Sequence, residues 1–191
     1  MRNKMYSTLI ATFLFGLLFS TQSCSNEAVD WPADYLTPVT DTGGNTLSFM
    51  LNGTPWRAQN INLFYPITIS SGFQNDTLSI LAFRSRGTSG DGSSSLFLDL
   101  FEPLTRKSFS VDSQGIHVAY TRDRSLVSSK IYLLDTAEPG QLILSRCDTI
   151  PGTGGFGIAS GTFFFTLTDS THSQKLTLTE GRFDVPFTTI H

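Results

Sequence analysis

The first residue that could support chemistry is Cys24, which follows an apolar run near the start of the chain. Arg2 and Lys4 precede this run, and residues 9–19 are almost entirely apolar. The run is too short to span a bilayer, which needs about 20 apolar residues, but it matches the apolar region of a secretory signal peptide. A cysteine at this position predicts a bacterial lipoprotein leader. In such a leader the thiol is alkylated by diacylglycerol and the new amino terminus is acylated after cleavage.

We therefore expect residues 1–23 to be a signal peptide and Cys24 to carry lipid, including palmitate-like acyl chains. Each buried CH₂ contributes about 0.8 kcal/mol, so several acyl chains anchor a protein durably. Thr21 stands where the usual lipoprotein signal has leucine, and the alternative is a plain secreted protein in which Cys24 is incidental. The tract Ser-Asn-Glu after Cys24 resembles a surface-export signal. It predicts an outer-membrane anchor exposed at the cell surface, with a periplasm-facing anchor as the alternative.

Composition limits the classes of function that fit the chain. Removal of residues 1–23 leaves 168 of the 191 residues, enough for one domain with a core. The formal charge of −3 becomes about −5 without Arg2 and Lys4, which argues against a nucleic-acid partner. With Cys24 lipidated, Cys147 is the one free thiol and no internal disulfide can form, and its place on an expected apolar strand predicts a buried, inert thiol rather than a nucleophile.

Motifs that resemble enzyme or cofactor sites lack the surroundings that such sites need. Residues 152–157 fit the dinucleotide pattern G-x-G-x-x-G, but a strand-like segment rather than a helix follows them. Asp91 lies among glycines and serines, yet one carboxylate is too few for calcium. His117, His172 and His191 show no zinc spacing. We therefore expect no enzyme, no bound metal and no cofactor.

Four residues are candidates for ligand contact. Tyrosine combines a flat apolar ring with a polar group, as carbohydrate platforms require, whereas Trp56 is expected in the core after its turn. The candidates are Tyr65, Asp91, Tyr120 and Tyr132. The loops expected to present a ligand site are 66–76, 87–95, 122–128 and 151–157.

Four tracts in which aspartate precedes Ser or Thr begin at Asp76, Asp135, Asp148 and Asp169. These tracts resemble the Asp-Ser/Thr-apolar acceptor of periplasmic O-glycosylation in Bacteroidota. The alternative is turn chemistry, because Asp followed by Ser or Thr ends strands well. The possible acceptors are Thr77, Thr136, Thr149 and Ser170.

The elements that must position these residues are strands. Residues 24–46 contain prolines and glycines without sustained periodicity and predict a lipidated N-terminus with a flexible tether. Residues 47–191 predict a single all-β domain, because segments of strand length recur between turn signals without helical stripes. About nine to ten antiparallel strands favour a two-sheet β-sandwich. The alternative is a lipocalin-like closed barrel.

Two ends of this domain carry distinctive motifs. The opening is FMLNGTPWRA at 49–58, and the closing hairpin contains GTFFF at 161–165 and GRFDV at 181–185. Together these motifs resemble a Bacteroidota lipoprotein family of unknown function. The resemblance spans roughly residues 47–187. It implies a lipoprotein with an all-β domain and assigns no catalytic residue. In the closing hairpin, Phe163, Phe165, Phe183, Val185 and Phe187 are expected to point inward.

These observations predict a non-enzymatic, lipid-anchored envelope protein that binds an unidentified glycan or protein, as a ligand-binding or adhesion-type module. One alternative is a structural or accessory subunit of an outer-membrane complex, with a sheet face as its interface. Another is a lipocalin-like carrier of an apolar ligand.

Overall fold

The computed structural model describes residues 36–60, 68–85, 93–111, 114–123 and 129–189. Within these ranges the secondary structure is all β, which confirms the predicted fold class. The described strands are β1 (Thr46–Leu51), β2 (Thr54–Arg57), β3 (Gln59–Asn60), β4 (Ile69–Gln74), β5 (Thr77–Ser85), β6 (Ser94–Phe101), β7 (Ser108–Ser110), β8 (Ile116–Asp123), β9 (Ser129–Leu134), β10 (Gln141–Thr149), β11 (Phe156–Asp169) and β12 (Lys175–Thr189).

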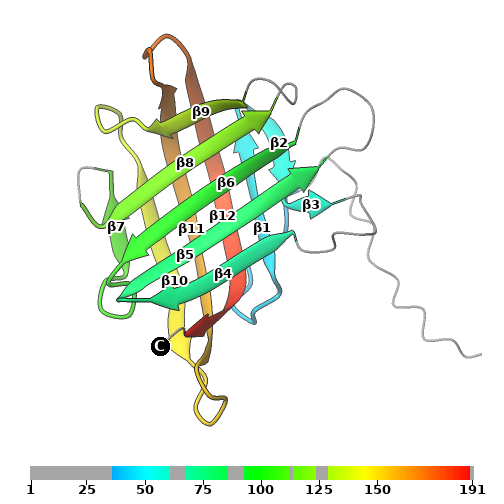
Figure 1. Ribbon diagram of the computed structural model, residues 1–191, viewed down its shortest axis with the longest axis vertical. Coiled ribbons are helices and arrows are strands. Elements are labelled where there is room, and N and C mark those ends of the chain that lie inside the picture. The colour runs from blue at the N-terminus through cyan, green and yellow to red at the C-terminus, as the bar shows by residue number, and fades with distance from the viewer. Residues whose placement is uncertain (1–35, 61–67, 86–92, 112–113, 124–128, 190–191) are drawn as a thin grey trace, which may run out of the picture. The chain divides into compact units, whose positions relative to one another are not determined.

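The strands form two layers that cross at a steep angle (Figure 1). The front layer has the order β4-β5-β6-β8-β9, and β3 is added to the end of β5. The back layer has the order β2-β1-β12-β11-β10-β7. Most pairings are antiparallel, as expected for short connections. The two exceptions are the short parallel pairings β3–β5 and β12–β4.

Two short pairings join the layers at opposite corners. The end of β12 pairs with β4, where Thr188 lies opposite Gly72. The end of β11 pairs with β9, where Leu167 lies opposite Leu134. The hydrogen-bonded circuit therefore closes, so the molecule is a two-layer sandwich that also has the connectivity of a flattened barrel.

Large side chains fill the space between the layers. The inward residues of β5 and β6 alternate with polar or half-exposed residues, as the period of two requires; they are Leu78, Ile80, Ala82, Leu96, Leu98 and Leu100. Phe49 stacks on Trp56 at 4.6 Å between ring centroids, and Tyr120 meets both rings edge-on. The inward rows expected in the closing hairpin are confirmed, since all five members are buried: Phe163, Phe165, Phe183, Val185 and Phe187.

Residues with positive φ lie at the first hairpin turn and at the bend of the closing strands. Asn52 and Gly53 both have positive φ, as a tight hairpin turn requires. Glu180 also has positive φ, and the pairing register of β11 with β12 shifts at Phe163–Phe165 opposite it. A side chain at Gly181 would overlap the ring of Phe163, so only glycine permits this close approach.

Two predicted boundaries differ from the structure. Residues 69–74, expected within a loop, form β4 and bury Ile69 and Phe73 in the core. Residues 36–45, expected as the end of a flexible tether, lie against the back layer and are called the N-terminal strap below. Residue 46, the last of the expected tether, begins β1, and residues 1–35 lie outside the described ranges.

Candidate functional site

The outer surface of the front layer carries an uncharged stripe of two adjacent rows, called the front-face stripe, and one of these rows is apolar throughout. Strand register places Leu81, Phe97, Ala119 and Leu133 opposite one another across β5, β6, β8 and β9. The adjacent row contains Phe83, Ser95, Thr121 and Ile131. Opposed residues on one sheet face have Cβ atoms about 4.5–5.5 Å apart, so these side chains adjoin.

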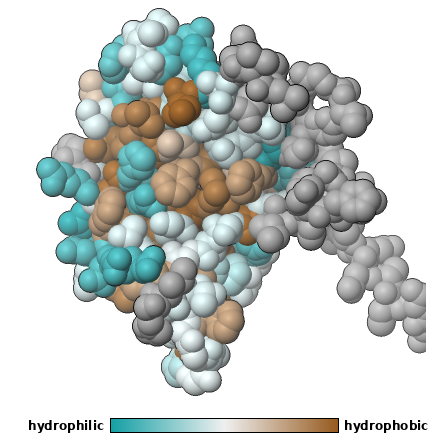
Figure 2. All heavy atoms as spheres, viewed as in Figure 1, coloured by the Kyte–Doolittle hydropathy of each residue, from teal (hydrophilic) through white to brown (hydrophobic). Residues whose placement is uncertain are grey.

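None of the eight stripe positions carries a charge. Ile131 is 55% exposed and Leu133 is 48% exposed, although both belong to regular strands. Figure 2 shows that apolar side chains gather over the middle of this face. Single exposed apolar residues are ordinary, whereas large contiguous apolar patches occur at interaction sites, so this face is the candidate site.

A row of potential catalytic residues borders the stripe. Ser79, Asp99 and His117 lie side by side across β5, β6 and β8. The Ser79 hydroxyl donates a hydrogen bond of 2.5 Å to Asp99, and His117 Nδ1 lies 3.9 Å from the other carboxylate oxygen. A nucleophilic serine needs the imidazole, not the carboxylate, as its immediate base. Because Asp99 lies between the other two, this geometry does not activate Ser79.

Two of the four predicted ligand contacts are buried, which contradicts their interpretation as surface residues. Tyr120 is 2% exposed and packs in the aromatic core, where burial raises the pKa of its phenol despite a hydrogen bond with Ser94. Tyr132 is 4% exposed, and its hydroxyl donates to Gln174. Tyr65 and Asp91 lie outside the described residues. Trp56 is buried as expected, and its Nε1 donates to Ser94.

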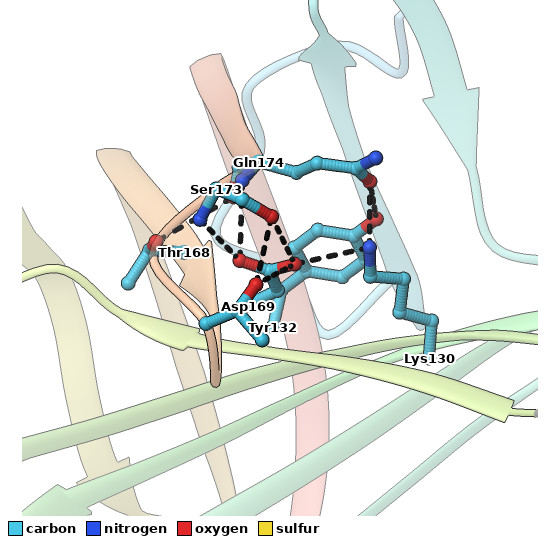
Figure 3. Close-up of polar contacts among 7 residues, drawn as sticks. Lys130, Tyr132, Thr168, Asp169, Ser173 and Gln174 are labelled. Carbon is cyan, nitrogen blue, oxygen red and sulfur yellow. Dashed lines mark hydrogen bonds and ion pairs between the residues drawn. The ribbon is translucent and has the colours of Figure 1, made fainter.

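Asp169 organises the polar network around Tyr132 (Figure 3). It ends β11, and its carboxylate accepts the N–H groups of Ser173 and Gln174, which close the hairpin turn. Lys130 of β9 lies 3.0 Å from the same carboxylate. Burial alone would raise the pKa of Asp169, but these hydrogen bonds and the lysine outweigh it and lower the pKa below its ordinary value. The network caps a turn and joins two strands.

Capping by aspartate carboxylates is also the alternative explanation for the predicted O-glycosylation tracts. Asp135 and Asp169 both use their carboxylates to cap backbone N–H groups, which is the turn chemistry held open as the alternative. Thr136, Thr149 and Ser170 are exposed. Thr77 is half-buried, and its hydroxyl donates to the carbonyl of Asn75. Modification of these four residues stays a prediction.

The N-terminal strap is fastened to the back layer by a buried carboxylate. Asp184 of β12 is 1% exposed and accepts hydrogen bonds from the backbone N–H groups of Thr42, Gly43 and Gly44. The hydroxyl of Thr40 donates a further bond of 2.6 Å. Burial alone would raise the pKa of Asp184, but these donors outweigh it and lower the pKa.

Further contacts hold the start of the strap over β1 and β12. The N–H of Thr37 donates to the Ser48 hydroxyl, and Arg182 donates to the carbonyl of Thr37. Val39 then borders a shallow hollow of about 280 Å³ on the outer surface of β10, β11 and β12. Ile143, Phe164, Glu180 and Arg182 also line this hollow. Sequence reasoning missed this arrangement because Asp184 lies about 140 residues from its partners.

Cys147 is buried, as expected, and burial raises the pKa of its thiol to about 11.

Among the described residues, no group of three or more His, Cys, Asp or Glu side chains could hold a metal ion. No helix in the described part of the chain is long and apolar enough to cross a membrane.

Comparison with known proteins identifies no relative of this chain. No family model matches the chain, and neither the curated proteins nor the solved structures contain a significant match. The assignment of function therefore depends on the surfaces described above.

Proposed function

We propose that this protein is a lipid-anchored, non-enzymatic component of the bacterial outer-membrane envelope that binds a protein partner through the front-face stripe. The observation that carries this proposal is the contiguous row of Leu81, Phe97, Ala119 and Leu133 on an exposed sheet face. Such a surface loses contact with water when it pairs with another apolar surface, at about 25 cal/mol per Å². This role corresponds to an accessory subunit or adhesion module.

Two other ligand classes receive less support from the described residues. Glycan binding favours exposed tryptophan and tyrosine, whereas Trp56, Tyr120 and Tyr132 are buried and their polar groups have partners within the domain. An apolar carrier needs an internal cavity, whereas the space between the layers holds stacked rings such as Phe49 on Trp56. A protein partner fits the exposed stripe more directly.

The partner is tested by site-specific photo-crosslinking in intact cells. A photoreactive residue at Leu133 should give one discrete adduct, and the same residue at Ser145 on the back layer should not. The second substitution Ile131→Glu should abolish the adduct from position 133, because a charge beside it disfavours apolar contact. Equal yields at Leu133 and Ser145, or an adduct insensitive to Ile131→Glu, would contradict the proposal. An adduct with the mass of two chains would identify the partner as a second copy.

The anchor is tested separately through Cys24. The variant Cys24→Ser should lose acyl labelling and leave the membrane fraction, because no thiol remains to receive diacylglycerol. Unchanged labelling would refute lipidation at Cys24 without affecting the crosslinking result.

A further inference from the structure

Exposed apolar side chains, called the strap-side patch, border the hollow beside the strap together with the charged residues Glu180 and Arg182. The apolar side chains come from three separate segments: Val39 of the strap, Ile143 of β10 and Phe164 of β11. Their exposed fractions are 61%, 48% and 44%. The patch lies on the outer surface of the back layer, whereas the front-face stripe lies on the outer surface of the opposite layer. The two apolar surfaces therefore face away from each other.

The chain leaves the described domain on the same side as the patch. Thr37 is held over Ser48 and Arg182 in the back layer, so Leu36 also lies on this side. The strap cannot drift from this position without breaking the hydrogen bonds to Asp184 as well. The exit point is thus fixed by the fold.

The length of chain before Leu36 limits how the domain can meet a membrane. If Cys24 carries lipid, twelve residue steps separate the anchor from Leu36. At about 3.3–3.6 Å per residue, they span roughly 40 Å when fully extended. To turn the front face toward the lipid, this segment would have to pass around the edge of two packed layers. To turn the back face toward the lipid, the segment needs only to span the distance between the membrane and Leu36. The back face therefore has the higher effective concentration at the membrane surface.

We propose that the protein turns its back layer toward the membrane and that the strap-side patch rests on the lipid surface. This inference depends on the lipid anchor of the proposed function and adds an orientation to it. Val39, Ile143 and Phe164 would enter the interfacial region, where apolar side chains lose contact with water. The front-face stripe would then point away from the membrane and remain free for its partner.

The test measures depth in the bilayer at matched positions on the two faces. Single cysteines replace Phe164 or Ile143 on the back face, and Leu133 or Ile131 on the front face, in the full lipidated chain. Each is labelled with bimane, while acylation protects Cys24 and burial protects Cys147. The unsubstituted chain measures background labelling. The proteins are reconstituted into vesicles of phosphatidylethanolamine and phosphatidylglycerol that contain a nitroxide-labelled lipid, and circular dichroism confirms that each variant is folded.

The nitroxide lipid should quench most of the fluorescence at positions 164 and 143 and little of it at positions 133 and 131. Equal quenching on both faces, or stronger quenching at 133 and 131, would overturn the orientation. Vesicle flotation of the parent chain and of Cys24→Ser tests the anchor independently. Flotation that depends on Cys24, combined with a wrong quenching pattern, would reject this inference alone. Flotation of neither chain would reject the anchor and, with it, the orientation.

Discussion

Asp184 shows how one buried side chain can determine the course of a whole segment. Its carboxylate collects N–H groups from consecutive strap residues and a hydroxyl from Thr40. A buried carboxylate must be compensated by hydrogen bonds, and these donors supply them. The polar, glycine-containing stretch that looks like a tether in isolation is therefore ordered by a residue near the other end of the chain.

Removal of the Asp184 carboxylate should release the strap. We expect Asp184→Ala to lower the free energy of unfolding by roughly 2–4 kcal/mol, because several buried donors lose a charged acceptor. Amide hydrogen exchange at residues 42–44 should rise by more than exchange in β5. Asp184→Asn, which keeps one oxygen acceptor, should lose less stability. Unchanged exchange at residues 42–44 in Asp184→Ala would contradict the role given to this side chain.

Acid should destabilise the domain through the same class of residue. The folded-state pKa values of Asp135, Asp169 and Asp184 are lowered, so the stability they contribute is present above the ordinary carboxyl pKa of 3.8. It is lost as pH falls from that value toward the lowered folded-state values. We expect the urea midpoint to be level near neutral pH and to fall below about pH 4.

Asp169→Asn isolates the contribution of one hairpin cap to this acid response. Its stability at neutral pH should be lower than that of the parent, and its decline below pH 4 should be shallower, because one titrating carboxylate is gone. Asp148→Asn, which changes an exposed carboxylate, serves as the control. Parallel pH profiles for Asp169→Asn and the parent would refute the assigned role.

The residue types in the candidate sites could be identified from sequence, but their neighbours could not. Tyr120 and Tyr132 are of a residue type that often contacts ligands. Within the fold, however, their hydroxyls form hydrogen bonds with Ser94 and Gln174. Ser79, Asp99 and His117 become adjacent only through strand register. Register depends on long-range pairing, which local residue patterns do not specify.

At the scale of elements, the bend of the closing hairpin depends on glycine. The β11–β12 register shifts at Phe163–Phe165, and Gly181 lies beneath the ring of Phe163. A bulge of this kind strengthens the local twist and lets the strand change direction. This bend allows β11 and β12 to belong to the back layer and still pair with β9 and β4 of the front layer at the two corners.

Gly181→Ala should therefore disturb this hairpin. The added methyl group would overlap the Phe163 ring, and overpacking of this kind costs about 1–3 kcal/mol of unfolding free energy. Thr179→Ala, at an exposed position on the same strand, should change stability by only about 0.5 kcal/mol. Urea denaturation of both variants provides the comparison, and equal losses would argue against a special role for Gly181.

Elements with clear alternation could be predicted from sequence, and those without it could not. The Leu78, Ile80 and Ala82 series marks β5, and its inward residues are buried as that period requires. In β4 the two core residues, Ile69 and Phe73, are separated by serines and glycine, which indicate a loop when read alone. Pairing with β5 along six positions overrides that weak local preference.

At the scale of the whole molecule, Cys147 reports on global opening. Its thiol is buried and its pKa is raised to about 11, so both access and thiolate formation are suppressed in the folded state. In a Cys24→Ser chain, a thiol reagent should modify Cys147 slowly in buffer and rapidly in denaturing urea. The reaction rate should rise with the unfolded fraction, as measured by circular dichroism. Rapid modification in buffer would show that this part of the core opens locally.

The pairing of β1 with β12 brings the beginning and the end of the domain together, with Thr46 opposite Asp184. During synthesis, the first strand must therefore wait for the last before the back sheet can form. The intervening chain exposes apolar strands during this interval, because their covering layer is still incomplete. Contacts between such distant segments also slow folding. The back sheet of the newly made chain therefore stays incomplete until β12 has been synthesised.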